Sequence, residues 1–247
     1  MPLDARSLLE AAFWGALGAS ALLVGAAIAY WANPSIKVNA AVMAVGSGVL
    51  IGSVAFELIG DAIEVAPPAQ LTVALLAGAG AFALGDWILD QRGGAQRKDA
   101  SGEQANGSPL AIVLGSILDG IPESFVLGLT VLQGAISVPL LAGVIMSNLP
   151  EGMSSSAGLK AAHWPARRVF LMWIAVVALS AIAAAAGYIF FQTMSTSTGA
   201  LVNCFAAGAL LAMIADTMLP ESYEVEGVLT GPLVTVGLAM SVFLETL

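Results

Sequence analysis

Apolar residues fill eight long stretches of the chain, and polar residues gather in the gaps between them. A helix of about 20 apolar residues is long enough to cross the hydrocarbon core of a bilayer. The pattern therefore predicts an all-α polytopic membrane protein, with residues 1–247 forming a single transmembrane domain. The predicted spans cover about residues 10–31, 38–64, 71–90, 109–133, 138–162, 167–192, 199–223 and 229–247.

One predicted connection is long and polar, residues 91–108, and it separates three spans from five. Seven of the eight cations fall in loops on one side of this topology: Lys37, Arg92, Arg97, Lys98, Lys160, Arg167 and Arg168. Arg6 lies alone on the other side. Because cytoplasmic loops are enriched in Lys and Arg, we expect loop 91–108 in the cytoplasm, both termini outside, and the chain in the plasma (cytoplasmic) membrane.

Composition agrees with the membrane class and limits the chemistry. The chain is 58% hydrophobic and 10% charged, with a mean hydropathy of +0.90. Its single cysteine, Cys204, excludes a disulfide framework and a cysteine zinc cluster. Its single histidine, His163, falls in a predicted loop, so an imidazole-rich metal site inside the membrane is excluded as well. The apolar run at 10–31 is too long for a signal-peptide core, and we expect it to be the first span.

A short polar motif occurs twice, near the middle of the fourth and fifth predicted spans. The copies are Asp119-Gly-Ile-Pro-Glu123 and Ser147-Asn148-Leu-Pro-Glu151, and a shift of 28 positions superposes proline on proline and glutamate on glutamate. Each proline removes one helical N–H and frees the carbonyl four residues before it. Carboxylates at bilayer depth are costly, so by default they mark an ion path.

The spacing within each copy places its polar groups together. Asp119 and Glu123 are four residues apart and share one helical face, as do Ser147 and Glu151, with Asn148 beside them. Their oxygen donors suit a divalent cation. We therefore predict a midplane metal site made by these five residues. A simpler alternative, in which two kinked helices only bond their polar groups to each other, is disfavoured because the motif recurs at matching depth.

Acidic residues outside the motifs extend the predicted ion route. Glu57 and Asp61 share a helical face at the outer end of the second span, where they could attract cations. Asp216 and Glu221 lie in the seventh span, toward its cytoplasmic end. We interpret the remaining acids near span ends as solvated surface charges: Glu64, Asp90, Glu224, Glu226 and Glu245.

The second and seventh predicted spans resemble each other. Residues 48–64 align without a gap on residues 208–224, with glycine, leucine, alanine and glutamate identities along the alignment. The two spans run in opposite directions across the membrane. This is typical of an inverted repeat, and it predicts a 3+2+3 arrangement with a site near the midplane.

Five features of the chain resemble the ZIP (Zrt/Irt-like) family: the paired midspan motifs, the eight spans, the outside termini, the long loop after the third span, and the Pro220-Glu221 ending of the seventh span. The resemblance implies transport of zinc, manganese, iron or a related divalent cation into the cytoplasm, through a metal centre between spans four and five. Asp119 stands where the family usually has histidine, and Gly120 where it usually has asparagine. In span seven, Asp216 and Thr217 occupy positions where the family often shows His-Glu.

These departures bear on the metal. Carboxylate in place of imidazole shifts preference toward harder cations such as Mn²⁺, and we expect weaker zinc binding than in a histidine-bearing relative. Gly120 offers no side-chain ligand and span six has no acid, which leaves open whether there is one metal site or two.

The function we predict is inward transport of a divalent metal, with no permanently bound cofactor and no enzymatic activity. The partners we expect are the cation and the bilayer; small-residue faces leave a homodimer open, and no nucleic-acid partner is expected. A channel, and a non-transporting metal-sensing or accessory subunit of the same fold, stay as alternatives. An intramembrane enzyme is disfavoured because Asp119 and Asp216 are its only candidate acid pair.

Overall fold

The computed structural model describes residues 4–32, 35–91, 109–132, 134 and 136–246, with only the backbone for 109–112, and within them it consists of helices joined by short turns. Its α-helices are α1 (Ala5–Trp31), α2 (Ile36–Ser53), α3 (Gly60–Val65), α4 (Pro68–Leu89), α5 (Pro109–Leu132), α6 (Val138–Ala161), α7 (Ala166–Gln192), α8 (Thr196–Met213), α9 (Leu219–Glu226) and α10 (Thr230–Leu244). Nearly all of the predicted loop 91–108, with Arg92, Arg97 and Lys98, lies outside the described residues.

Local sequence signals set several helix ends. Asp4 caps α1, because its Oδ1 accepts a hydrogen bond from the backbone N–H of Arg6 at 3.1 Å. The first helix therefore begins five residues before the predicted span. Pro68 occupies the first position of α4, where its missing N–H has no helical partner to lose. Gly227 follows α9 with φ of 56°, a conformation that suits glycine, and α10 then folds back beside α2.

Six stretches are long and apolar enough to cross a membrane: Ala5–Trp31, Ile36–Val65, Pro68–Leu89, Val113–Leu132, Ala166–Gln192 and Thr196–Leu244. They are the helices of a multi-pass membrane protein, as the sequence predicts. Helix α6 has the length of a span, but its polar residues, among them Asn148, Glu151 and three consecutive serines, lower its hydropathy. The stretch Thr196–Leu244 is continuous in composition, yet the chain turns within it after α9.

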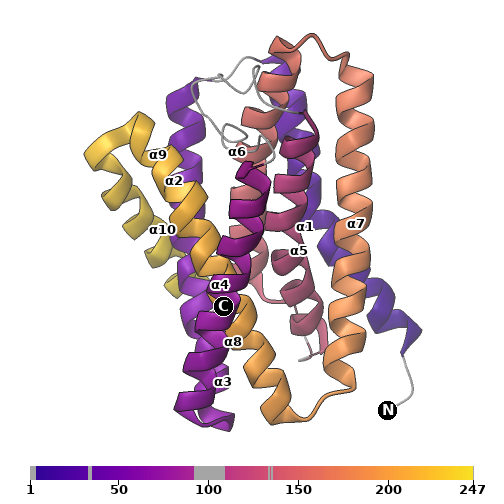
Figure 1. Ribbon diagram of the computed structural model, residues 1–247, viewed down its shortest axis with the longest axis vertical. Helices are drawn as coiled ribbons and strands as arrows, with labels where there is room; N and C mark the ends of the chain where they lie inside the picture. Colours follow the sequence, from indigo (N-terminus) through magenta and orange to yellow (C-terminus); the bar gives the residue numbers. More distant parts are fainter. Residues whose placement is uncertain (1–3, 33–34, 92–108, 133, 135, 247) are drawn as a thin grey trace.

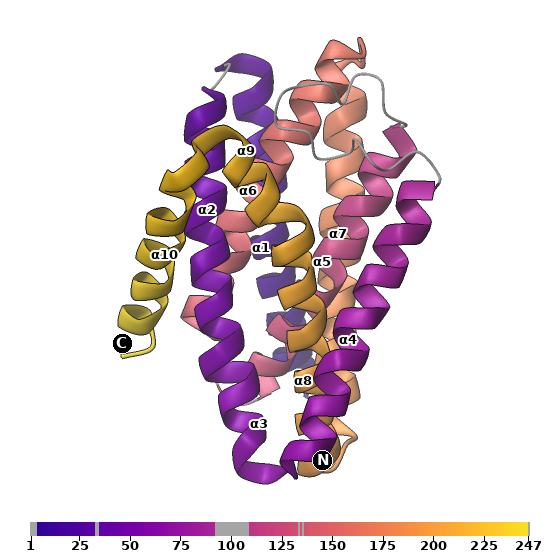
Figure 2. The same ribbon diagram turned by 60° about the vertical axis from the view of Figure 1, so that its left-hand side comes forward.

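The helices form an elongated bundle in which α5 and α6 are central (Figures 1 and 2). Helix α1 packs on α6 and α7, α2 packs on α6 and α10, α4 packs on α8, and α5 packs on α7. We call the end with the α3–α4 connection and the start of α1 the lower end, as it is drawn in both figures. The upper end holds the α6–α7 connection. There Lys160 Nζ donates to the carbonyls of Ala29 and Tyr30 at the end of α1, at 3.2 and 3.1 Å.

Glycines allow the backbones of four of these helix pairs to come into direct contact. In each pair, both helices contribute one glycine. Gly48 on α2 lies against the carbonyl of Val234, and Gly237 on α10 against that of Val45. The same reciprocal contacts join α4 to α8, α1 to α6 and α5 to α7: Gly78 with Phe205, Gly208 with Leu75, Gly25 with Leu149, Gly152 with Leu22, Gly128 with Ala184, and Gly187 with Phe125. A side chain at any of these positions would collide with a neighbouring backbone.

Two α-helices are interrupted by π-helical segments. Segment η1 (Val54–Ile59) joins α2 to α3, and η4 (Ile214–Met218) joins α8 to α9. A π-helical turn holds an extra residue, so it changes which side chains face the core on either side of it, and such turns are frequent at functional sites. Prolines 122 and 150, by contrast, lie within α5 and α6 without ending either helix.

Candidate functional site

A small cavity lies near the middle of the bundle, between α2, α5, α6 and the run from α8 through η4 to α9. The space open to the centre of a water-sized sphere is about 20 Å³, which is enough for one water molecule or a cation of similar size. Carboxyl groups, hydroxyl groups and thioethers line it: Asp119, Glu123, Glu151 and Glu221; Ser147, Ser154, Ser155 and Thr217; Met43, Met213 and Met218. We call it the central cavity.

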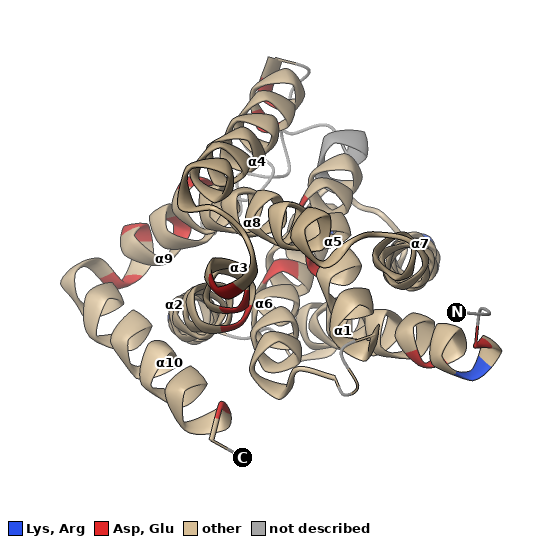
Figure 3. Cartoon of the chain, turned by 90° about the horizontal axis from the view of Figure 1, so that it is seen from below, with Lys and Arg blue, Asp and Glu red and all other residues tan. Residues whose placement is uncertain are grey.

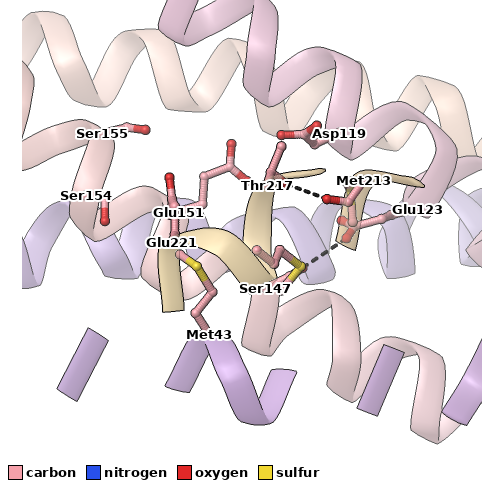
Figure 4. A pocket seen from close by; sticks show the side chains of 11 residues that line it. Met43, Asp119, Glu123, Ser147, Glu151, Ser154, Ser155, Met213, Thr217 and Glu221 are labelled. Carbon is pink, nitrogen blue, oxygen red and sulfur yellow. Dashed lines mark hydrogen bonds between the residues drawn. The ribbon is translucent and has the colours of Figure 1, made fainter. Parts of the chain in front are cut away.

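The four carboxyl groups reach the central cavity from three helices. Asp119 and Glu123 lie one turn apart on α5, Glu151 lies on α6, and Glu221 lies on α9. Figure 4 shows Asp119 pointing into the same space as Glu151 and Glu221. The side chains of Asp119, Glu123 and Glu221 are buried. Burial at this depth is costly for a carboxylate unless a cation, a proton or a hydrogen-bond donor accompanies it.

A hydrogen bond joins the two copies of the motif. Ser147 Oγ on α6 donates to Glu123 Oε1 on α5 at 3.0 Å, and Figure 4 draws this contact at the wall of the cavity. Oε1 of Glu151 is buried and accepts no hydrogen bond from any residue that the structure describes. The cavity therefore contains a carboxylate oxygen whose coordination is incomplete within the described chain.

The backbone around Pro150, the proline of the second motif, is contacted by α2. Pro150 deprives the Met146 carbonyl of its helical donor, and a Cβ on Gly46 would lie 2.9 Å from that carbonyl oxygen. Asn39 on α2 donates through Nδ2 to the carbonyl of Pro150 at 3.3 Å and to Ser154 Oγ at 2.6 Å. The freed carbonyl thus packs against α2, and Met146 is absent from the cavity lining.

Four of the five predicted metal-site residues line the central cavity: Asp119, Glu123, Ser147 and Glu151. The fifth, Asn148, does not. Its side chain is buried, and its Nδ2 lies 3.4 Å from the carbonyl oxygen of Gly18 on α1, to which it donates. In this conformation Asn148 ties α6 to α1.

The four predicted path residues lie in four different places. Glu221 lines the central cavity, whereas Asp61 lines a larger cavity at the lower end. Glu57 borders neither: its Oε1 accepts a hydrogen bond from Ser137 Oγ at the start of α6, at 2.5 Å. Asp216 is exposed on the outside of η4 and is absent from both linings.

Sequence reasoning missed several residues of the lining. Ser154 and Ser155 follow Glu151 by three and four positions, so helical spacing could have found them. Thr217 faces the cavity while its neighbour Asp216 does not, and Thr217 lies four positions from both Met213 and Glu221, so helical spacing could have found it as well. The thioethers of Met43, Met213 and Met218 carried no signal in the sequence that separates them from ordinary core methionines.

The carboxyl groups of the central cavity do not form a closed metal shell. Across the described residues, no three side chains of His, Cys, Asp or Glu are grouped closely enough to hold a metal ion. The chain matches no family model and none of the curated proteins. The chemistry of the cavity must therefore be argued from the residues of this chain.

Proposed function

We propose that this protein transports divalent metal cations across the membrane toward the cytoplasm, and that the central cavity is the transport site. One observation carries the proposal: four carboxyl groups from α5, α6 and α9 line a buried space the size of one small ion. An isolated aspartate at mid-membrane costs about 2.5–3.5 kcal/mol on the insertion scale. Four such groups around one cavity are best explained by a cation that binds there.

The donor set supports a divalent ion. Carboxylate and hydroxyl oxygens suit hard cations such as Mn²⁺, and thioethers favour softer ones. Carboxylates that share one cavity repel each other unless a cation or a proton accompanies them. We propose that an entering ion draws Glu123, Glu151 and Glu221 inward and displaces protons from the site.

Two sets of positions support an eight-span 3+2+3 inverted repeat. The π-helical segments begin at Val54 and Ile214, which are 160 positions apart, as are Gly48 and Gly208 of the sequence alignment. The contacts of these two glycines also correspond, since Gly48 meets Val234 on α10 and Gly208 meets Leu75 on α4. In this proposal α6 and α10 complete the eight spans, and the polar residues of α6 are tolerated because they line the site.

The charged ends support inward transport. Lys37, Lys160, Arg167 and Arg168 all lie at the upper end, in the first turns of α2 and α7 and the last turn of α6, so we assign that end to the cytoplasm. Below Glu123 and Ser147 lies a central apolar layer, made of buried side chains that close the bundle: Leu50, Val54, Val126, Leu127, Val144 and Leu210. The central cavity lies above this layer, on the side that we assign to the cytoplasm. The resemblance to the ZIP family is in keeping with this mechanism.

The test is uptake of Mn²⁺, Zn²⁺, Fe²⁺ and Cd²⁺ into liposomes that contain the purified protein. We expect saturable uptake by the wild type, and uptake at the level of empty liposomes for Glu123→Ala and for Glu151→Ala. Glu10→Ala is the matched control, since it removes an exposed acid from α1 far from the cavity. Uptake of no divalent ion by folded wild type, with metal still bound, would favour a metal-sensing or accessory role.

A further inference from the structure

A second cavity lies at the lower end, on the other side of the central apolar layer. It is enclosed by α3, the ends of α5 and α7, and the start of α8, and its volume is about 390 Å³. Asp61 and Glu64 of α3 border it and are exposed, while Asn203 of α8 borders it and is 6% exposed. We call it the lower cavity.

Asn203 is the residue that most needs an explanation there. Its Oδ1 is buried and has no hydrogen-bond partner among the residues that the structure describes. Buried polar atoms are rarely left without a partner, because such an atom has lost its hydrogen bonds to water and gained none in return. Asn203 lines the lower cavity, so this buried oxygen without a partner belongs to a residue that a ligand in the cavity would meet. A cation that is coordinated by this oxygen would remove the penalty.

The surroundings of the lower cavity favour positive charge. Helices α3, α5 and α7 end at it, and the carbonyl end of a helix carries partial negative charge. Only α8 begins there, with the opposite polarity. Among the described basic residues Arg6 alone lies at the lower end, and Figure 3, viewed from this end, shows blue only at the start of α1 and red on α3.

We propose that Asp61 and Asn203, with Glu64 at the rim, form a second cation site that takes a hydrated divalent ion before it reaches the central cavity. The inference rests on the proposed function and adds a binding step to it. The lower cavity is far larger than one ion, so the cation keeps water ligands between itself and the protein. Binding through water to exposed carboxylates is weak and is screened by salt, whereas the central cavity requires the ion to lose most of its water.

The experiment is titration of the detergent-purified full chain with Mn²⁺, with free Mn²⁺ measured from its electron paramagnetic resonance signal. The wild type should show a tight and a weak class of sites. A Glu123→Gln/Glu151→Gln variant should keep only the weak class, which 0.5 M KCl should weaken at least tenfold. Adding Asp61→Asn or Asn203→Leu to that variant should abolish the weak class, and adding Glu10→Gln should leave it unchanged.

The outcomes separate the two proposals. If Asp61→Asn and Asn203→Leu both leave the weak class intact, the lower site is wrong, whatever happens at the central cavity. If the tight class survives Glu123→Gln/Glu151→Gln, the transport site is misplaced, while loss of the weak class in Asp61→Asn would still establish the lower site. Asp61 is exposed, so its substitution tests the proposal even if Asn203→Leu fails to fold.

Discussion

The runs 36–65 and 196–226 are built alike, yet corresponding positions in the two runs line different cavities. Each is an α-helix of 18 residues followed by a π-helical segment and a short α-helix. At positions 160 apart, Met43 corresponds to Asn203 and Asp61 to Glu221. Met43 and Glu221 line the central cavity, and Asn203 and Asp61 line the lower one. Each cavity is therefore lined by one of these four residues from each run.

The difference between the cavities comes from what faces these two runs. In the central cavity α6 contributes Glu151, Ser154 and Ser155, and the space is about 20 Å³. In the lower cavity α5 contributes Leu129 and Leu132, and the space is about 390 Å³. A similar backbone thus supports a narrow site that can surround an ion near the middle of the bundle and a wide vestibule at the lower end. The backbone of the two runs sets where these side chains lie. The side chains of the facing helix set the size of the cavity, and therefore how much of its water an ion must lose.

The largest expected effect separates two acids of the run 196–226. Glu221→Gln should lower Mn²⁺ uptake at least tenfold, because it removes a buried carboxylate from the central cavity. Asp216→Asn should change uptake by less than twofold, because that side chain is exposed on the outside of η4. Initial rates of uptake into liposomes at equal amounts of folded protein give the measurement. Equal losses for both variants would contradict the inward and outward placement that η4 imposes.

The helices and most of the candidate site could be predicted from the sequence for physical reasons. Long apolar runs leave few options other than helices, and i, i+4 spacing brings Asp119 next to Glu123 and Ser147 next to Glu151. The shared depth of the two motifs placed these pairs at one level of the bundle. The structure adds the contact between the pairs, from Ser147 to Glu123.

The rest depends on features that helical spacing cannot supply. Met218 lines the central cavity five positions after Met213, a spacing that separates two side chains in an α-helix but brings them to one face in the π-helical segment η4. Asn148 lies in the motif, yet its partner is a backbone carbonyl 130 residues away, at Gly18. Cavity volume is likewise a property of packing among four segments, and no single segment encodes it.

A second prediction tests whether glycine contacts stabilise the packing of the two runs by similar amounts. Gly78→Ala separates α4 from α8 and Gly237→Ala separates α10 from α2, because each added Cβ collides with a neighbouring carbonyl. Each should destabilise the fold by about 1–3 kcal/mol, as overpacking does. Gly80→Ala, also on α4, meets no atom within 4 Å and should stabilise the helix by about 0.5–1 kcal/mol.

Thermal unfolding in detergent can measure all three, with a thiol-reactive dye that reports exposure of the buried Cys204. The expected order of midpoints is Gly80→Ala above wild type and both other variants below it. A large loss for Gly78→Ala with none for Gly237→Ala would show that the two runs are held by different contacts.

The smallest expected effect concerns the thioether that corresponds to Asn203. Met43→Leu keeps the volume of a buried side chain and should cost less than about 1.5 kcal/mol of stability. It removes a soft sulfur from the central cavity, so Cd²⁺ should bind about threefold to tenfold more weakly, while Mn²⁺ binding changes by less than about twofold. Competition between Cd²⁺ and Mn²⁺ for uptake measures this ratio, and Met240→Leu on the exposed face of α10 is the control. If both metals lose affinity equally, Met43 acts through packing, and the central cavity selects ions by its oxygen ligands and its size alone.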